Sequence, residues 1–210
     1  MNEKMDNRKR ILEVALHLFN ERGTANVSTN IIAQEAGISV GNLYYHFKNK
    51  EQIVRALFER FSEDTDRAFS LPEDRVPTPD DLDALLQLNF VVLWRYRFFY
   101  RERIALLQRD PELMSRYRIV RQRGFDGFAY LLRSFTEAGF MRLPETPEEE
   151  SQLAQVCWIV SDFFLPFLEA DGGEADLSAL EARHQEQGAS LLRLVLRPYR
   201  ITDHVNKIER

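Results

Sequence analysis

The residues best suited to chemistry lie close together, between Ser28 and Lys50. Asn42 has a side chain that can form a bidentate pair with the edge of an adenine base. Tyrosine and histidine can donate hydrogen bonds to phosphate, and lysine can neutralise its charge. The stretch offers Tyr44, Tyr45, His46, Lys48 and Lys50. This combination is typical of a surface that contacts nucleic acid.

Ser39 offers a different chemistry, because residues 37–41 match the G-x-S-x-G pattern of a hydrolase nucleophile. That pattern requires a strand before the serine and a helix after it. Here a polar, helix-forming segment precedes the serine, so we expect Ser39 to cap a helix. The four histidines show no pairing at metal-binding spacing. We therefore expect neither an enzyme nor a metal or cofactor site.

Capping residues and glycines divide this stretch into short helices. Ser28 can cap a helix that ends at Gly37, and Ser39 can cap a second one that runs to about Tyr45. Two short helices joined by a glycine-centred turn form a helix-turn-helix. In that motif the second helix lies in the major groove, with its N-terminal residues at the base edges.

Start and stop signals place further helices on both sides of the motif. The first helix should begin after Asp6 and stop at Gly23, and a fourth should open at Asn49. Three prolines make residues 71–79 the best linker. Beyond it we expect helices near residues 79–97, 98–109, 111–138, 147–169 and 176–197. The sequence therefore predicts an all-α fold, with an N-terminal three-helix head and a larger helical body.

The stretch 28–39 (STNIIAQEAGIS), followed by Gly41, residues 43–47 (LYYHF) and Lys50-Glu51, resembles the signature of the TetR family of transcriptional regulators. The resemblance runs from the first helix to about Phe61 and covers under a third of the chain. It implies a homodimer with a helix-turn-helix DNA-binding domain over residues 1–50. Residues 51–210 would form a helical connecting, effector-binding and dimerisation domain. Most family members are repressors that their ligand releases from DNA.

The resemblance assigns DNA contacts position by position. Thr29 and Asn30 open the second helix, where family members touch phosphate or a base. Val40, Gly41 and Asn42 occupy the base-reading turn of the recognition helix. The chain departs from the commonest pattern at Asn42, where threonine is frequent, and at Val40, which is apolar. The operator therefore cannot be copied from a relative.

Further along the motif, Tyr44 and His46 resemble phosphate contacts, and Lys50 resembles the lysine at the start of the fourth helix. The resulting set of predicted DNA-binding residues is Thr29, Asn30, Val40, Gly41, Asn42, Tyr44, Tyr45, His46, Lys48 and Lys50.

Composition limits the class of protein and its partners. The net charge is −5, yet residues 1–62 hold nine Lys and Arg against seven Asp and Glu. The head is thus the only part whose charge suits nucleic acid.

The single cysteine excludes a disulfide framework and indicates a reducing compartment. Residues 1–19 do not resemble a signal peptide, and the uncharged run 151–161 is too short to span a bilayer. We expect a cytoplasmic protein with no membrane partner.

In the body, Asn89 and Arg121 lie on or beside otherwise apolar helix faces. Two interpretations stay open for Asn89: a hydrogen-bonded core residue, or a polar group in a ligand pocket. The predicted pocket residues are Asn89, Trp94, Phe98, Arg121, Tyr130 and Phe163. Such a site would bind a small apolar or amphipathic effector, whereas tight core packing would leave no room for one. The basic run 95–103 is expected to be solvated or paired with nearby acids.

The last two helices carry apolar residues on broad faces, and in the family they pair with their mates as a four-helix bundle. Gly188 would allow close approach across a two-fold axis, and His184 is expected to be packed. The predicted dimer interface comprises Val160, Leu180, His184, Gly188, Leu191 and Val195.

The resulting hypothesis is a ligand-responsive transcriptional regulator, a repressor that binds a near-palindromic double-stranded DNA operator as a homodimer. Two alternatives remain: a DNA-binding regulator without a small-molecule effector, and a serine hydrolase that uses Ser39.

Overall fold

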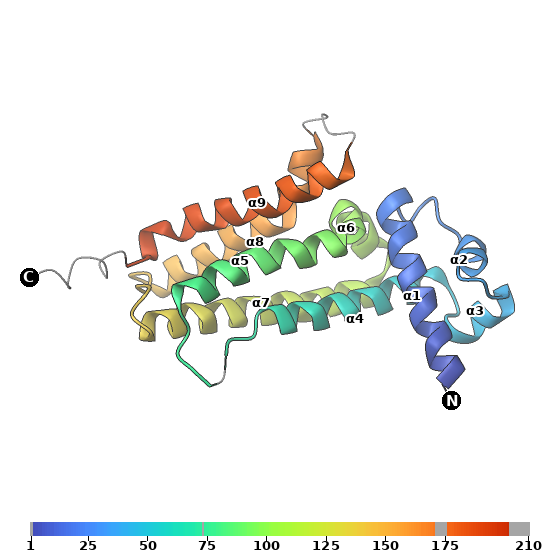
Figure 1. Cartoon of the computed structure of the whole chain (residues 1–210), viewed down its shortest axis with the longest axis horizontal. Coiled ribbons are helices and arrows are strands. Elements are labelled where there is room, and N and C mark those ends of the chain that lie inside the picture. The colour runs from blue at the N-terminus through green and yellow to red at the C-terminus, as the bar shows by residue number, and fades with distance from the viewer. Residues whose placement is uncertain (1, 73, 171–175, 202–210) are drawn as a thin grey trace, which may run out of the picture. The chain divides into compact units, whose positions relative to one another are not determined.

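The computed structural model describes residues 2–72, 74–170 and 176–201, and the all-α prediction is confirmed there (Figure 1). Within these residues the only β-type pairing is an isolated bridge between Met141 and Arg200. The helices are α1 (Asn2–Arg22), α2 (Thr29–Glu35), α3 (Val40–His46), α4 (Lys50–Ala68), α5 (Pro79–Arg95), α6 (Arg97–Arg109), α7 (Pro111–Glu137), α8 (Pro147–Ala170) and α9 (Leu177–Leu196), followed by a 3-10 turn at Arg197–Tyr199.

Most helix boundaries agree with the sequence signals to within one or two residues, because local capping sets them. Asp110 accepts hydrogen bonds from the backbone N–H groups of Glu112 and Leu113 at the start of α7. The Thr146 hydroxyl accepts one from Glu149 at the start of α8. The exception is α1, which begins at Asn2 rather than after Asp6. The intervening Glu, Lys and Met residues are good helix formers, so nothing there stops the helix.

The chain divides into two compact units, the first made of residues 1–64 and 96–117, the second of residues 65–95 and 118–210. The core of the first unit is apolar and fully buried. Its completely shielded side chains include Ile11, Phe19, Ile32, Leu43, Ile53 and Leu57. Residues 96–117 pack with α1–α4, so the compact unit is larger than the residues 1–50 expected from the family. The expected functional division, with DNA binding in residues 1–50 and effector binding and dimerisation in residues 51–210, stays a prediction.

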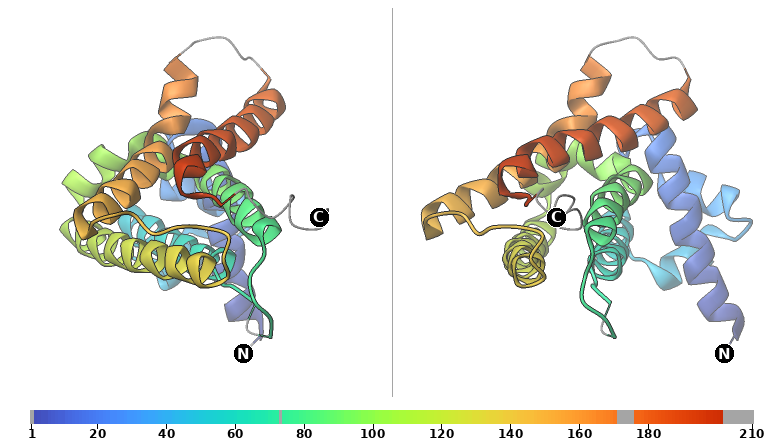
Figure 2. Two further views of the ribbon diagram at one scale, coloured as in Figure 1. Left: turned by 90° about the vertical axis from the view of Figure 1, so that its left-hand side faces the viewer. Right: turned by 60° about the vertical axis from the view of Figure 1, so that its left-hand side comes forward.

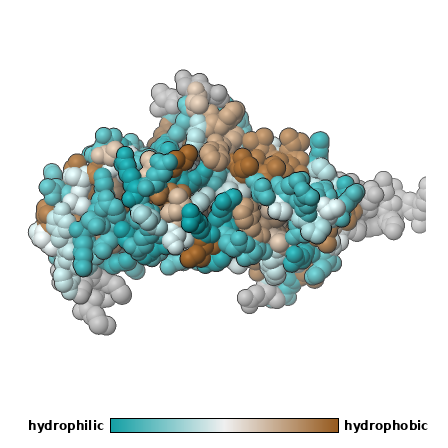
Figure 3. Space-filling view, turned by 180° about the vertical axis from the view of Figure 1, so that it is seen from behind, coloured by the Kyte–Doolittle hydropathy of each residue, from teal (hydrophilic) through white to brown (hydrophobic). Residues whose placement is uncertain are grey.

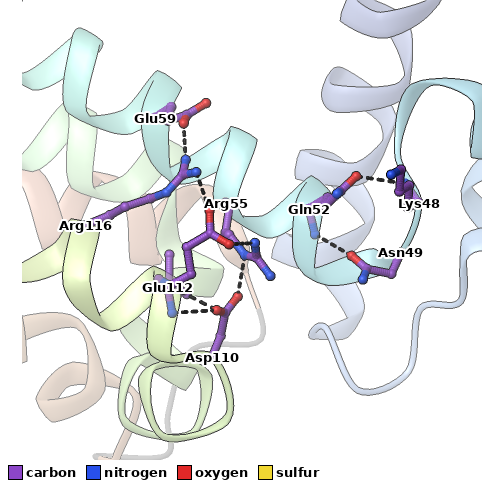
Figure 4. Close-up of polar contacts among 9 residues, drawn as sticks. Lys48, Asn49, Gln52, Arg55, Glu59, Asp110, Glu112 and Arg116 are labelled. Atoms are coloured by element: carbon purple, nitrogen blue, oxygen red, sulfur yellow. Dashed lines mark hydrogen bonds and ion pairs between the residues drawn. The ribbon is translucent and has the colours of Figure 1, made fainter.

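Ion pairs join α4 to the α6–α7 corner within the first unit (Figure 4). The Arg55 guanidinium donates to Asp110 at 2.7 Å and also contacts Glu112. Arg116 on α7 binds Glu112 at 2.6 Å and pairs with Glu59 on α4. Burial alone would raise the pKa of the Asp110 carboxyl, but bonds from Leu113 N–H and Arg55 hold that pKa below its ordinary value. This network fixes α4 at its middle.

The basic run beginning at Arg95 is partly buried rather than fully solvated. Arg97 pairs with Glu21 at 2.7 Å, in agreement with the expected pairing to acids. Arg103 lies between two aromatic rings, with its guanidinium carbon 6.0 Å from the Tyr100 centroid and 5.9 Å from that of Tyr117. These residues therefore belong to the interior of the first unit.

In the second unit, α9 packs against α5 and α8 (Figure 2). The imidazole of His184 is fully buried there, with its centroid 5.2 Å from the ring of Phe90 and 5.6 Å from that of Trp94. A Cβ atom added to Gly188 would overlap the Phe90 ring. Gly188 thus permits close packing of α9 on α5 inside the chain, which corrects the expectation that it faces a second chain.

Among the described residues, α8 is the one helix whose length and apolar composition would be sufficient to cross a membrane. This property is weak support for a membrane span, because core helices of soluble proteins share it. Leu153, Leu165 and Leu168 on α8 are indeed buried against the rest of the unit.

The contact between Gly188 and Phe90 leads to a prediction about stability. Gly188→Ala should lower the free energy of unfolding by about 1–3 kcal/mol, because the new methyl group overpacks the core. Gly127→Ala is the matched control, since a Cβ there meets nothing within 4 Å. That substitution should be neutral or stabilising by up to about 1 kcal/mol. Denaturant unfolding would measure both, and equal effects would contradict the assigned packing.

Candidate nucleic-acid interface

The turn between α2 and α3 has the geometry that a helix-turn-helix requires. The Ser28 hydroxyl accepts a hydrogen bond from Ile31 N–H, and the Ser39 hydroxyl accepts one from Asn42 N–H at 3.1 Å. Gly37 has φ +63, a left-handed conformation that favours glycine. Ser39 follows a helix rather than a strand, so it serves as the predicted cap and lacks the setting of a hydrolase nucleophile.

The outer face of α3 carries exposed side chains over a buried anchor. Leu43 is fully buried and Phe47 nearly so. At the N-terminal end, Val40 and Gly41 are exposed, so backbone and methyl groups are accessible to a base edge. Tyr45 is 65% exposed, which makes it the most accessible aromatic ring of the helix. Val40 and Gly41 are therefore accessible in the turn for which base reading is predicted, and that role stays a prediction.

Tyr44 connects the recognition helix to the start of α2. Its hydroxyl lies 3.1 Å from the Thr29 hydroxyl in a hydrogen bond, and the ring remains 46% exposed. Asn30 follows Thr29 and is exposed. The Thr29 hydroxyl and the first backbone N–H groups of α2 thus lie beside the Tyr44 hydroxyl of α3, an arrangement that suits a phosphate.

Asn42 and His46 are half-buried. The Asn42 amide oxygen is shielded and has no hydrogen-bond partner in the described part of the chain. A bidentate pair with adenine would require this side chain to turn outward. The His46 ring lies 5.3 Å from that of Tyr45 in an edge-on contact. Base reading by Asn42 and phosphate binding by His46 therefore stay predictions.

Lys50 has partners that the sequence did not indicate. Its ammonium group donates to the backbone carbonyls of Thr24 at 2.5 Å and Val27 at 3.1 Å. Glu102 on α6 binds the same loop, because its carboxylate accepts from the Thr24 N–H at 2.7 Å and from the Thr24 hydroxyl. Lys50 is thus bound to the α1–α2 loop. The predicted contact with a phosphate would have to use the N–H group of the ammonium that these two bonds leave over.

Lys48 is exposed at the end of α3, next to the start of α4 (Figure 4). Its backbone N–H donates to the Gln52 side chain at 2.8 Å, while Gln52 N–H donates to Asn49 at 2.9 Å. This capping arrangement fixes the backbone and leaves the Lys48 ammonium at the surface. Its position is consistent with the predicted phosphate contact.

The predicted pocket residues occupy different environments. Phe98 packs on Phe19 in the core of the first unit, with ring centroids 5.5 Å apart. Asn89 is half-buried and donates to the Ser161 hydroxyl at 3.0 Å. Trp94 is buried, whereas three further members of the set are exposed: Arg121, Tyr130 and Phe163. Phe98 therefore serves core packing, and the pocket around the remaining residues stays a prediction.

The predicted dimer residues also differ in accessibility. Leu180, His184 and Gly188 are buried within the chain, whereas Leu191 is 37% exposed and Val160 and Val195 are half-buried. Sequence periodicity did not separate the inner face of α9 from the outer one, because both are apolar. The exposed apolar side chains of the two helices are Val156, Ile159, Phe163, Phe167, Leu177, Leu191 and Leu194.

The helical head therefore defines a helix-turn-helix protein, and comparisons with known proteins agree. The family model described as "Bacterial regulatory proteins, tetR family" matches residues 11–57, and that described as "Bacterial transcriptional repressor" matches residues 60–204. The chain belongs to the TetR family of transcriptional regulators.

Individual relatives support this assignment at different levels. A TetR-family regulator from Marinobacter aquaeolei VT8 is 33% identical, with a TM-score of 0.81, and the alignment covers 93% of this chain and 91% of that one. The SmeT chain in a SmeT–triclosan complex is 22% identical in sequence to this chain, with a TM-score of 0.62. The alignment covers 94% of this chain and 93% of that one, and at this identity it supports the fold alone. An HTH-type regulator of Staphylococcus aureus strain USA300 is 47% identical over 55 residues, which span 26% of this chain and 30% of that relative.

Substitution of Ser39 distinguishes its role as a helix cap from the alternative role of a hydrolase nucleophile. Ser39→Ala should lower stability by about 1 kcal/mol, because α3 loses its N-terminal acceptor. Ser39→Asp should retain most of that stability, since a carboxylate also caps a helix. Thermal unfolding would test both variants. A burst of activated-ester hydrolysis that disappears in Ser39→Ala would instead show that the serine is a nucleophile.

Proposed function

We propose that the protein is a cytoplasmic repressor that binds a near-palindromic operator as a homodimer and is released by a small apolar or amphipathic ligand. The observation that carries the DNA-binding part is the exposed N-terminal face of α3 beside the Thr29–Tyr44 pair. Two such heads, related by a two-fold axis, would enter successive major grooves about 34–36 Å apart. A regulator without an effector is the alternative.

The dimer surface is proposed to be the outer face of α8 and α9. Four of its apolar side chains lie at helical spacing on α8, and three of these are about half exposed or more: Ile159, Phe163 and Phe167. Figure 3 shows a group of hydrophobic residues at the upper right of that view, with smaller ones elsewhere on the same face. A contiguous apolar surface of this kind is typical of an interface between proteins.

The effector site is proposed to lie in the second unit, near α5, α7 and α8. Asn89 on α5 and Ser161 on α8 form a hydrogen-bonded pair in which both residues are half-buried. Gly124 on α7 lets the Trp158 indole lie directly against the helix backbone, because a Cβ atom there would overlap the ring, and so provides an aromatic wall for such a site. One structural neighbour, SmeT, is described in complex with triclosan, which supports an aromatic ligand class by analogy of fold.

Ligand entry can be followed by fluorescence, because both tryptophans of the chain, Trp94 and Trp158, belong to this unit. A panel of apolar and amphipathic compounds should include some that change tryptophan emission and weaken operator binding in parallel. Compounds that change emission without affecting operator binding would favour the regulator without an effector.

The docking of α3 predicts the effect of changing its central polar residue. Asn42→Ala should relax the preference at one base pair of each half-site by about 1–3 kcal/mol while leaving nonspecific binding unchanged. Gln155→Ala on α8 is a control of similar chemistry in the second unit. Fluorescence anisotropy with a selected site and its single-base variants would measure the change. An unaltered base preference would exclude Asn42 as a base-reading residue.

The proposed interface predicts a specific loss of assembly. Phe163→Glu should convert the dimer to monomer at micromolar concentration, because a charge would be buried against the second copy. Val76→Glu is the control, since Val76 is 66% exposed but lies in the segment before α5. Sedimentation equilibrium would distinguish the two variants. A wild-type monomer at this concentration would refute the interface and leave palindrome recognition without a basis.

A further inference from the structure

Arg8 on α1 lies against the far end of the recognition helix. Its guanidinium carbon is 5.2 Å from the centroid of the Phe47 ring, and Phe47 is the residue that terminates α3. Phe47 is only 3% exposed, whereas Arg8 is exposed. The aromatic ring is thus a fixed platform, and the guanidinium covers its outer side.

A guanidinium that lies over a ring uses its face for that contact. Its N–H groups project in the plane, so their edges stay available to a planar or tetrahedral anion. Among the side chains that the structure describes, which begin at residue 7, no carboxylate forms an ion pair with Arg8. By contrast, Arg10 donates to the Asn7 side chain at 2.7 Å. The guanidinium of Arg8 therefore lies over Phe47 and remains accessible to an anion from solvent.

The dimensions of the motif bring this group close to the DNA backbone. A seven-residue helix is about 10 Å long, and the major groove is about 12 Å wide. When α3 occupies the groove, both of its ends lie near phosphate groups. Phe47, the residue that ends α3, and the exposed Lys48 lie at one of these two ends.

We propose that Arg8 binds a DNA phosphate beside the C-terminal end of α3, with Phe47 as its platform and Lys48 as its neighbour. The proposal rests on the DNA-binding function proposed above. It makes α1 part of the interface, although the sequence assigned contacts only to residues 29–50. Bidentate donation from a preoriented guanidinium would fix the register of the recognition helix on the duplex.

The test compares Arg8→Ala with Arg10→Ala. The two residues are two positions apart, which places them about 200° apart around α1, while each substitution removes the same charge. Arg8→Ala should weaken binding to all DNA sequences about 10-fold, and it should reduce the slope of log K against log salt by about 1.8, which is about 0.9 for each of the two protomers. Arg10→Ala should leave the slope unchanged. Arg8→Lys should restore the slope but only part of the affinity, because lysine lacks the planar fork.

A scan with methylphosphonates, which neutralise one phosphate at a time, would locate the contact. Wild-type protein should lose affinity at a small set of phosphates, and Arg8→Ala should become insensitive at one of them while retaining the others. Thermal unfolding of Arg8→Ala shows whether the head remains folded. The proposal would be overturned if Arg8→Ala bound DNA with the same affinity, the same salt slope and the same sensitivity to each methylphosphonate as the wild-type protein. Absence of any DNA binding by the wild-type protein would instead refute the proposed function itself.

Discussion

The position of the recognition helix depends on a polar clamp around the loop that precedes α2. Lys50 on α4 donates to the carbonyls of Thr24 and Val27, and Glu102 on α6 accepts from the N–H and hydroxyl of Thr24. Loop backbone groups that lie away from water need such partners, and here two distant helices supply them. Gly23, at φ +74, brings the loop so close that a Cβ atom would stand 2.8 Å from the Glu102 carboxylate. The clamp therefore holds the loop before α2 between Lys50 of α4 and Glu102 of α6.

The same end of α1 is bound to α6 by further contacts within the first unit. The Asn20 side chain accepts from Phe98 N–H at 3.0 Å, and the Asn20 carbonyl accepts from Arg101 at 2.8 Å. With the Arg97–Glu21 pair, these bonds make α6 and α1 one hydrogen-bonded assembly. A displacement of α6 relative to α1 would break these three contacts together, two of which are charge-assisted. For the ligand response proposed above, these bonds are the route by which a movement of α6 would reach the DNA-binding head.

Local features of the fold could be predicted from the sequence, whereas contacts between distant residues could not. Ser28, Ser39 and Thr146 cap helices through bonds three residues away, so a short window contains the whole signal. Glu102 and Thr24 are 78 residues apart, and no periodicity connects them. Gly188 shows the same limit, because its space is filled by Phe90 from a helix much earlier in the chain. The candidate site follows this division: the exposed face of α3 was predictable, but the partners of Lys50 and the position of Arg8 were not.

Amide hydrogen exchange of residues 21–33 in a Glu102→Ala variant tests the clamp most directly. Removal of the carboxylate leaves the Thr24 N–H without its acceptor, so this segment should exchange faster, while exchange in α8 and α9 stays unchanged. Glu63→Ala on α4 is a control that removes an exposed carboxylate elsewhere in the first unit. The account predicts faster exchange in residues 21–33 together with weaker operator binding for Glu102→Ala alone. Unchanged protection of this segment, with operator affinity equal to that of the wild-type protein, would show that the clamp does not position the recognition helix.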